Sequence, residues 1–576
     1  MTKEISRRSF LQGIGLAGAA TVGAGLAGCA PAAPAAEGEK LSDTGDQAHR
    51  WSWEAGPEDI SEDQIAETVE HEFVVVGAGL AGLATAASLA ENGGDVLVVE
   101  KNTTWASRGS VIAHIGALNT PRWVAAGVEY SKFDVFRDWD VQNGSRMDNA
   151  QVWTFLERSG EALEWSLQKA EALGGTVELL GSHYFGEKFP EYYGTVMVNA
   201  SDKMIELEGN GIEMGKGNAL HFSLYQSSLD NGAQYLWSTP GKQLVVEDGK
   251  VTGIICVNAD GDYVRYKATK GVILATGDIS GDEEMSACFA PIMNRCQSSM
   301  YIPAGMNTGD GQKMAIWAGA KMQDGPWPPM IHPQGYGMFL GPFMCTNSFG
   351  RRFMNEDTWT QGKSLGILNQ PGNVDYGFCV FDKNYSRDMH ATRKIGGGLM
   401  WDSVYRVYGN NEPDEMYDER ILGMGVDGGF IYQADTLEEA AALVKADYPT
   451  FDEDLFLAEV ARYNELVAAG EDTDFGKRAD LMLPIAEAPF FIEKVGPNKM
   501  CAPGGALITG YGQVIDEEEN PIEGLYAVGN CSGGLYAVDY PLVINGNSHG
   551  RCITFGYLLG RQLTGVEEVQ SYPTRA

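Results

Sequence analysis

The sequence predicts an α/β protein in which one large domain is interrupted by an inserted α+β capping domain. A glycine-rich turn separates two apolar runs within residues 73–101, a β meander occupies residues 243–276, and strand-and-turn character returns after residue 500. Between these blocks, from residue 326 onward, the composition shifts toward Trp, Pro, Met and aromatic residues, and residues 437–470 show helical periodicity. At 576 residues the chain is too long for a single core.

The N-terminal segment carries an export signature and is set apart from the fold. The letters SRRSFL at residues 6–11 form a twin-arginine pattern, and a Gly/Ala-rich stretch follows as far as Cys29. The segment resembles the signal of an exported lipoprotein with Cys29 as the lipidated residue; cleavage within residues 30–36, releasing a soluble protein, is the alternative. Either form would work outside the cytoplasm, in the cell envelope. Residues 30–65 are Ala/Pro-rich and then acidic, which is typical of a flexible linker.

Residues 73–101 read as a strand, a glycine-rich turn, a helix and a second strand, the order that a dinucleotide-binding GxGxxG motif requires. Gly77 permits a tight turn, Gly79 lets the backbone approach a pyrophosphate, and Gly82 lets the helix pack closely on the strand. The N-terminus of the helix then faces the phosphate charge.

The second strand, Val96 to Val99, ends in Glu100, whose carboxylate can accept a hydrogen bond from a ribose hydroxyl. An acidic residue at this place favours an adenosine with a free 2′-hydroxyl. The Ser/Gly loop at residues 103–120 is expected to wrap the pyrophosphate through Ser107, Ser110 and backbone N–H groups. Together these features predict dinucleotide binding in a Rossmann-like domain.

Residues 148–173 show the apolar periodicity of a scaffold helix, and a β meander follows downstream. Its strands are expected at residues 243–246, 251–257 and 263–266, separated by turns at two Asp-Gly pairs. The meander leads into a buried strand and a tight turn at residues 271–277, GVILATG. The large domain is therefore expected to combine a βαβ unit with a β meander.

The C-terminal part returns to the large domain. Residues 525–530 again read as a strand and a turn, and residues 546–550 open an apolar helix. No second GxGxxG–strand–acid unit occurs, so the sequence gives no support for a separate NAD(P)H site. The expected segments are a signal at residues 1–29, a linker at 30–65, the large domain at 66–325 and 500–576, and the capping domain at 326–499.

Composition argues against some classes of partner and cofactor. The formal charge of −36 argues against nucleic acid, because phosphate binding needs a basic face. An acidic surface aids solubility and also suits a basic electron-carrier partner. The nine cysteines form no CxxC or CxxCH pair, so we expect no iron-sulfur cluster, no c-type haem and no other metal site in this chain.

Several dispersed blocks occur in one order: GAGLAG with Glu100, VILATG, NTGDG at residues 307–311, GRRFMNE at 350–356, and GLYAVGN followed by GNS. This order resembles that of the soluble fumarate reductase-like flavoproteins, a superfamily that also contains urocanate reductases and 3-ketosteroid dehydrogenases. The resemblance covers most of residues 72–562. It implies a non-covalent FAD, a mobile cap over the isoalloxazine ring, and hydride transfer between flavin N5 and a carbon of an activated C=C or CH–CH bond.

The resemblance places FAD among the glycine turn, the ATG turn and the C-terminal helix. The N-terminus of that helix would face the flavin's N1 and C2 carbonyl, where the helix dipole stabilises the reduced cofactor. The residues expected to contact FAD are Gly77, Ala78, Gly79, Leu80, Ala81, Gly82, Glu100, Lys101, Ser107, Ser110, Gly116, Val246, Ala275, Thr276, Gly277, Gly529, Asn530, Asn547 and Ser548.

The substrate-binding residues of fumarate reductases are only partly matched. His332, which precedes a proline, matches the imidazole that holds a substrate carboxylate. Where the proton-donating arginine is expected after RFMNE, this chain offers Gln361 or Thr360. Cys501 stands in the place of a later histidine, and Val543 in that of a carboxylate-binding arginine. Because buried carboxylates are costly without charge partners, these departures argue against a small dicarboxylate substrate.

The C-terminal region is instead similar to that of 3-ketosteroid dehydrogenases. In those enzymes the Tyr of a Tyr-Pro pair hydrogen-bonds the substrate ketone, and Tyr540 holds the matching place here. A neutral phenol suits polarising a carbonyl or donating a proton in a dry pocket. We expect Tyr540 to be the acid, with Tyr336 as the alternative, and His332 and Gln361 to orient the activating group.

The sequence therefore predicts an exported FAD-dependent reductase that acts on a C=C bond of an α,β-unsaturated ketone or carboxylate, aromatic or apolar rather than fumarate. Electrons would come from a membrane-linked donor such as a cytochrome, a flavoprotein or a quinol. Two alternatives stay open. One is a dehydrogenase that introduces a C=C bond next to a ketone, and the other is a non-catalytic flavin-bearing lipoprotein that relays electrons.

Overall fold

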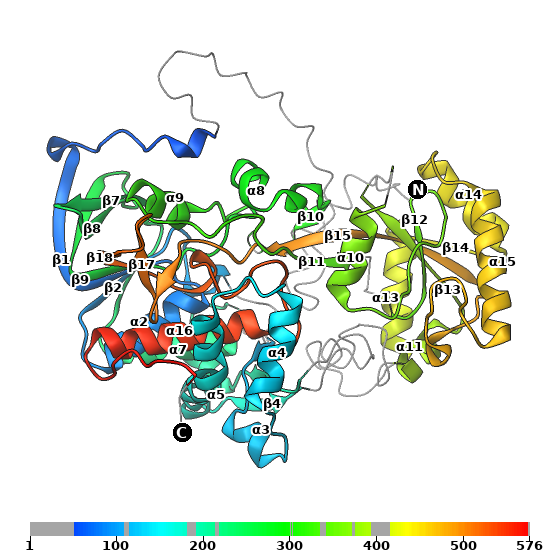
Figure 1. Cartoon of the computed structure of the whole chain (residues 1–576), viewed down its shortest axis with the longest axis horizontal. Helices are drawn as coiled ribbons and strands as arrows, with labels where there is room; N and C mark the ends of the chain where they lie inside the picture. Colours follow the sequence, from blue (N-terminus) through cyan, green and yellow to red (C-terminus); the bar gives the residue numbers. More distant parts are fainter. Residues whose placement is uncertain are drawn as a thin grey trace, which may run out of the picture.

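The predicted α/β fold is confirmed by the computed structural model. In Figure 1 the chain forms two bodies side by side, a larger one with blue, green and red segments and a smaller one in yellow and green. The structure describes residues 51–108, 114–180, 192–212, 218–299, 301, 303, 305–334, 341–370, 372, 375–392 and 415–573. The predicted signal at residues 1–29 and the lipidation site at Cys29 lie outside this part.

The larger body is built on a nine-stranded sheet around β1 (Ile65–Val76). β1 pairs in parallel with β2 (Val96–Val99) and with β9 (Tyr263–Leu274). The strand order is β16-β17-β18-β9-β1-β2-β6, and β7 and β8 join through β9. The other strands are β6 (Gln234–Leu236), β7 (Gly241–Glu247), β8 (Lys250–Val257), β16 (Ile508–Thr509), β17 (Gln513–Ile515) and β18 (Pro521–Ala527).

The βαβ unit and the meander form as predicted, with one difference. The strands expected at residues 263–266 and 271–274 are a single strand, β9, because the residues between them stay extended and pair with β1. The predicted scaffold helix is α5 (Asn149–Ala172), whose first turn is capped by the Asp148 carboxylate at 2.8 Å from the Ala150 nitrogen.

Small residues bring two distant helices together above the sheet. α2 (Leu80–Glu91) follows β1, and α16 (Asn547–Leu563) packs along it (Figure 1). A Cβ placed on Gly556 would lie 2.9 Å from the Thr85 hydroxyl oxygen, and one on Gly560 would lie 2.5 Å from Ser88 Cβ. Glycine at these two places therefore sets the close approach of α16 to α2, and with it the position of both helix N-termini.

The smaller body contains a six-stranded sheet centred on β15 (Phe490–Cys501). Side chains of β13 (Gly377–Asp382) alternate between its faces: Phe378 and Val380 meet one helical layer, and Cys379 and Phe381 the other. The first layer is α14 (Leu437–Asp447) and α15 (Glu453–Ala469), and the second is α10 (Thr360–Leu368), α11 (Tyr385–Thr392) and α13 (Glu415–Asp427). The other strands are β10 (Ser298–Ser299), β11 (Met330–Gln334), β12 (Met344–Asn347) and β14 (Ile431–Ala434).

The borders differ slightly from the predicted segments. The smaller sheet takes in Ser298 and reaches Cys501, so it extends beyond residues 326–499. Residues 51–65 belong to the predicted linker, yet Trp53 is buried and its ring lies 5.4 Å from that of Phe289. This end of the linker therefore packs on the larger body.

A third, three-stranded sheet and several short helices complete the larger body. Within the described ranges, no helix combines the length and apolar character needed to cross a bilayer. The remaining elements are β3 (Ile115–Gly116), β4 (Thr176–Leu179), β5 (Thr195–Asn199), α3 (Pro121–Ala125), α4 (Lys132–Gln142), α6 (Asp202–Glu208), α7 (Ala219–Asp230), α8 (Glu283–Phe289) and α9 (Asp310–Trp317).

Candidate active site

The turn between β1 and α2 is closed by glycines that no larger residue can replace. Gly77 has φ +106°, and a Cβ placed on it would lie 2.6 Å from the Ala275 carbonyl oxygen. A Cβ on Gly82 would lie 1.9 Å from the Gly77 carbonyl oxygen. Gly79 is the N-cap of α2 and brings no side chain to its first turn. The first N–H groups of α2 are therefore left for an anionic ligand.

The ATG turn and the GLYAVGN turn meet beside this glycine turn. The Gln312 side-chain nitrogen donates to the carbonyl oxygens of Gly277 at 2.9 Å and Asn530 at 3.3 Å, which ties the two turns together. A Cβ on Gly529 would lie 2.7 Å from Ala81 Cβ, so this turn also touches α2. The structure thus brings together most of the residues expected to contact FAD, namely Gly77, Ala78, Gly79, Leu80, Ala81, Gly82, Ala275, Thr276, Gly277, Gly529 and Asn530. Together with Asn547 and Ser548 at the start of α16, these residues form the FAD cradle.

The N-terminus of α16 lies at the same place. Its N-cap, Gly546, has no capping side chain, and its carbonyl oxygen accepts the Gly116 N–H at 2.9 Å. The Ser548 hydroxyl donates to the side-chain oxygen of Asn530 at 3.5 Å, and Asn547 begins the helix. The N-termini of α2 and α16, whose N-cap residues are both glycines, therefore lie beside the same turns, and in α16 the Ser548 N–H donates to the Tyr540 hydroxyl. This arrangement suits the phosphates and the reducible ring of FAD.

Glu100 and Lys101 take different positions. The Glu100 carboxylate accepts the Ala78 N–H at 2.7 Å and the Asn102 N–H at 2.8 Å, which holds it against the glycine turn. The Lys101 ammonium instead forms an ion pair with Asp310 at 2.8 Å. The structure therefore gives Lys101 an ion-pair partner in α9.

Val246, another residue expected to contact FAD, does not lie against the glycine turn. Val246 is 46% exposed and pairs near the tip of the meander, whereas Gly241, at the opposite end of β7, is the residue that lies against β1. The contact between meander and cradle is thus made five residues earlier than expected. Ser107 lies in a short 3₁₀ turn after β2, and Ser110 and Tyr336 fall outside the described residues.

Three of the expected catalytic residues meet where the two bodies touch. Gln361, in the first turn of α10, accepts the Ile331 N–H at 3.3 Å, next to His332 on β11. The Gln361 side-chain nitrogen donates to the carboxylate of Asp539, the residue before Tyr540. One hydrogen-bonded bridge thus connects the segments that carry His332, Gln361 and Tyr540.

Burial keeps the imidazoles of this region uncharged at neutral pH. It lowers the pKa of His332 to about 4. It also lowers the pKa of His114 to about 3, and repulsion by His549 and His332 adds to that effect. A neutral His332 forms a hydrogen bond but brings no positive charge to a substrate carboxylate.

Asp539 is a titratable group that the sequence analysis missed. Its carboxylate accepts the Tyr540 N–H at 2.8 Å and the Gln361 amide, and no cation of the described chain pairs with it. Burial raises the pKa of Asp539 to about 7, although the Tyr540 N–H works in the opposite direction. Near neutral pH this carboxyl therefore exists in both protonation states, which suits proton transfer. An acid directly before a Tyr-Pro pair was the only signal in the sequence.

Tyr540 is placed as a neutral hydrogen-bond donor. Its hydroxyl oxygen accepts the Ser548 N–H at 3.0 Å, and its ring centroid lies 5.2 Å from that of Tyr536. The side chain is 2% exposed, and burial raises the pKa of Tyr540 well above its ordinary value. The phenol proton is therefore retained, and the hydrogen bond that the oxygen accepts strengthens it as a donor.

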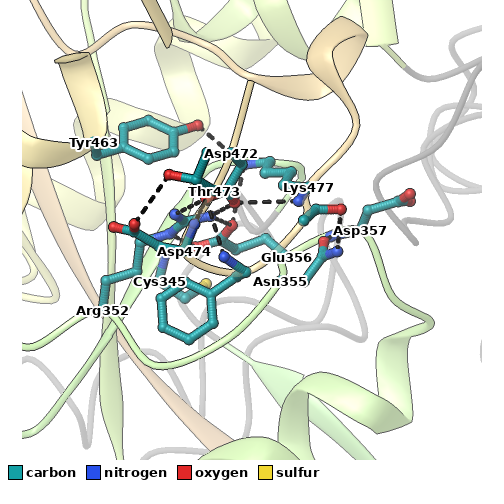
Figure 2. Close-up of polar contacts among 12 residues, drawn as sticks. Cys345, Arg352, Asn355, Glu356, Asp357, Tyr463, Asp472, Thr473, Asp474 and Lys477 are labelled. Atoms are coloured by element: carbon teal, nitrogen blue, oxygen red, sulfur yellow. Dashed lines mark hydrogen bonds and ion pairs between the residues drawn. The ribbon is translucent and has the colours of Figure 1, made fainter. Parts of the chain in front are cut away.

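An ion-pair cluster in the smaller body holds the segment that leads into α10 (Figure 2). The Arg352 guanidinium lies 2.8 Å from the carboxylates of both Glu356 and Asp472, and the Lys477 ammonium lies 3.2 Å from Glu356. All four side chains are at most 2% exposed. Burial raises the pKa of Asp472, but the Arg352 hydrogen bond prevails and holds it at about 2. The balanced charges fix the start of the helix that carries Gln361.

Comparison with known proteins agrees with this geometry. The family model described as FAD binding domain matches residues 72–546. The chain is 25% identical over 521 residues to vinyl phenol reductase of Lactiplantibacillus plantarum, covering 86% of this chain and 96% of that protein. It is 26% identical over 592 residues to 3-oxosteroid 1-dehydrogenase of Mycolicibacterium smegmatis, covering 85% and 96%. The open conformation of a flavocytochrome c3 fumarate reductase has the same fold, with a TM-score of 0.62, 24% identity, and coverage of 90% and 83%.

The cradle and the comparisons point to the same cofactor. Glycines leave room for a backbone-bound pyrophosphate, the Glu100 carboxylate lies against the glycine turn, and two helix N-termini supply partial positive charge. The chain therefore belongs to the FAD binding domain family, as a fumarate reductase-like, FAD-dependent oxidoreductase that acts on C=C or CH–CH bonds.

Proposed function

We propose that this oxidoreductase saturates a C=C bond conjugated to a carbonyl or carboxyl group in an aromatic or apolar compound. The observation that carries the proposal is the neutral polar set at the contact between the two bodies. Tyr540 and His332 are buried without charge, and Gln361 is an amide. Such groups suit one activating oxygen, whereas the two carboxylates of fumarate need buried cations.

The residues divide the work by their chemistry. FAD, when bound and reduced, supplies the hydride for the β-carbon. Tyr540 donates a hydrogen bond to the activating oxygen, and His332 and Gln361 orient it. The sequence hypothesis also gives Tyr540 the proton for the α-carbon. The raised pKa of the Tyr540 phenol makes it a weak acid, so Asp539, with a pKa of about 7, is the better proton donor.

The remaining parts of the proposal concern location and electron supply. The twin-arginine pattern at residues 6–11 supports export to the cell envelope, with Cys29 as a lipid anchor or a freely released protein as the alternative. The sequence offers one dinucleotide motif, which FAD occupies. We therefore infer that electrons reach a non-covalently bound FAD from a membrane-linked cytochrome, flavoprotein or quinol.

An anaerobic assay with dithionite-reduced viologen tests the reductase reading. The substrates are benzylideneacetone, cinnamate, 4-vinylphenol and fumarate. We expect dye oxidation with benzylideneacetone or cinnamate and little with fumarate, and turnover of 4-vinylphenol alone would contradict the proposed activating carbonyl or carboxyl group. Tyr540→Phe should keep bound FAD and lose about 10²–10³-fold in kcat/KM, the range for one lost donor at a developing oxyanion. An enzyme inert toward every alkene would refute the proposal.

A dehydrogenase that introduces a C=C bond next to a ketone is the second candidate. It is favoured by the likeness to a 3-oxosteroid 1-dehydrogenase and by Tyr540 preceding Pro541. The same enzyme preparation distinguishes the two directions. Turnover of a saturated ketone with an oxidising dye, without turnover from reduced viologen, would select the dehydrogenase.

A further inference from the structure

Arg551 is a charged side chain buried in the larger body beside the FAD cradle. It lies near the start of α16 and is 1% exposed. Its Nη2 donates to the carbonyl and hydroxyl oxygens of Ser532, the latter at 2.8 Å, and the guanidinium carbon lies 5.2 Å from the Tyr536 ring centroid. Its Nη1 is also buried, and no acceptor in the described part of the chain binds it.

No carboxylate balances this charge among the described residues. The titratable groups that sense Arg551 are Cys531, Tyr536 and Tyr540, and burial raises the pKa of each, so all three stay neutral. The N-terminus of α16 adds partial positive charge to the same region. A buried guanidinium without an anion is strongly unfavourable, so this region stabilises a negative charge brought by a ligand.

The neighbours of Arg551 indicate which ligand brings that charge. Ser532, which Arg551 holds, lies two residues after Asn530, and Asn530 accepts the Ser548 hydroxyl. Both Asn530 and Ser548 belong to the FAD cradle, whereas the hydrogen bonds of Gln361 lead away to β11 and Asp539. The negative charge that pairs with Arg551 is thus expected to belong to FAD rather than to the substrate.

We propose that Arg551 binds the negative charge that FAD acquires on two-electron reduction, and that it thereby raises the reduction potential of the cofactor. Two electrons and one proton entering FAD leave one net negative charge, which the unused Nη1 donor and the guanidinium charge stabilise. The inference rests on the FAD assignment alone, so it holds whichever substrate and direction of reaction the enzyme has.

The test measures the potential of the holoenzyme, with dithionite as reductant and a reference dye under anaerobic conditions. Arg551→Met should lower the affinity for reduced relative to oxidised FAD at least tenfold, a shift of about 30 mV for a two-electron couple. Arg551→Lys should recover part of that loss. Arg561→Met removes the same charge from the other end of α16, where Arg561 pairs with Glu567 at 2.8 Å, and should leave the potential unchanged.

The melting temperature, the binding of oxidised FAD and the KM for substrate distinguish binding of reduced FAD by Arg551 from other roles of this residue. Without FAD, Arg551→Met should melt at the same or a higher temperature, because the methionine removes an unbalanced charge. A lower melting temperature of the FAD-free variant, or an unchanged potential, would overturn the proposal. Loss of oxidised FAD binding would assign Arg551 to the phosphates. A higher KM for cinnamate but not for benzylideneacetone, at unchanged potential, would assign it to a substrate carboxylate.

Discussion

In the larger body, the segments around the FAD cradle touch through glycines, whereas in the smaller body the segment leading to Gln361 is held by buried charges. A Cβ added to Gly82 would lie 1.9 Å from the Gly77 carbonyl oxygen, so this contact is limited by steric exclusion. Arg352, Glu356, Asp472 and Lys477 balance one another, so contact in the cap is electrostatic. A steric contact tolerates no added atom, while a charge network tolerates changes that preserve its balance.

The largest effect is expected from filling the cradle. Gly82→Val places carbon atoms where the Gly77 carbonyl lies, so α2 must move off β1. We expect loss of FAD binding and at least about 4 kcal/mol of stability, in the range of exceptional point mutations. FAD absorbance and chemical unfolding measure both.

Gly423→Ala is the matched control in the cap, since nothing lies within 4 Å of its added Cβ in α13. It should gain up to about 1 kcal/mol of stability. Retained FAD in Gly82→Val would show that the glycine contact is not required.

The next largest effect is expected from removing one charge of the buried ion-pair cluster in the smaller body, formed by Arg352, Glu356, Asp472 and Lys477. Lys477→Met leaves Glu356 and Asp472 with a single buried cation, and we expect a cost of about 3–5 kcal/mol. FAD should remain bound at 25 °C, because the cradle is untouched. The double variant Lys477→Met/Glu356→Gln restores charge balance and should cost less than the single one. Equal or additive losses in the two variants would contradict the idea of a balanced network.

A smaller, pH-dependent effect is expected at Asp539, where the bodies meet. Its folded pKa of about 7 lies above the ordinary value of 3.8, so the folded state binds the proton more tightly. Its stabilising contribution is full below about pH 4 and is lost as the pH rises through 7, amounting to at most about 4 kcal/mol. Asp539→Asn should remove this part of the pH dependence in chemical unfolding at pH 5, 6, 7 and 8, whereas Val538→Ala, exposed next to it, should keep it.

The smallest effects are expected at exposed ion pairs, one in each body. Lys250 pairs with Glu523 on the larger body, and Lys383 pairs with Glu487 on the smaller one, both at 2.6 Å. Replacing either lysine by alanine should cost less than about 1 kcal/mol, because solvent screens both pairs. A large loss in only one body would mean that the contrast between the bodies extends to their surfaces.

Sequence patterns were enough to predict those helices, strands and turns that are determined by residues close together in the chain. The strand β1 was predicted from the apolar run at residues 73–76, and α2 from the glycines at 77, 79 and 82 that precede it. The meander was predicted from its two Asp-Gly turns. The sequence pattern shows that a strand exists but not which of its ends lies against β1, so it did not show that Gly241 rather than Val246 makes that contact. The ion pair of Lys101 with Asp310 was not predicted, because the two residues lie more than two hundred positions apart in the chain.

The residues missed altogether owe their properties to distant neighbours. Burial raises the pKa of Asp539 to about 7, and its partner Gln361 lies 178 residues earlier in the chain. Arg551 is distinctive because its buried Nη1 finds no acceptor among the described residues, which only a three-dimensional structure reveals. Asp472 forms its ion pair with Arg352, and Lys477 with Glu356, and both partners lie more than a hundred residues earlier in the chain. Sequence periodicity carries no record of such pairings.

The packing of α16 on α2 also sets the order in which the site can be assembled. The Ser88 hydroxyl donates to the Tyr557 carbonyl at 2.8 Å across a separation of 469 residues. A nascent chain that has completed β1, α2 and β2 still lacks the helix that covers them, so it exposes apolar surface and offers FAD half a cradle. We therefore expect FAD to bind only after residues 547–563 have been synthesised, because α16 completes its site.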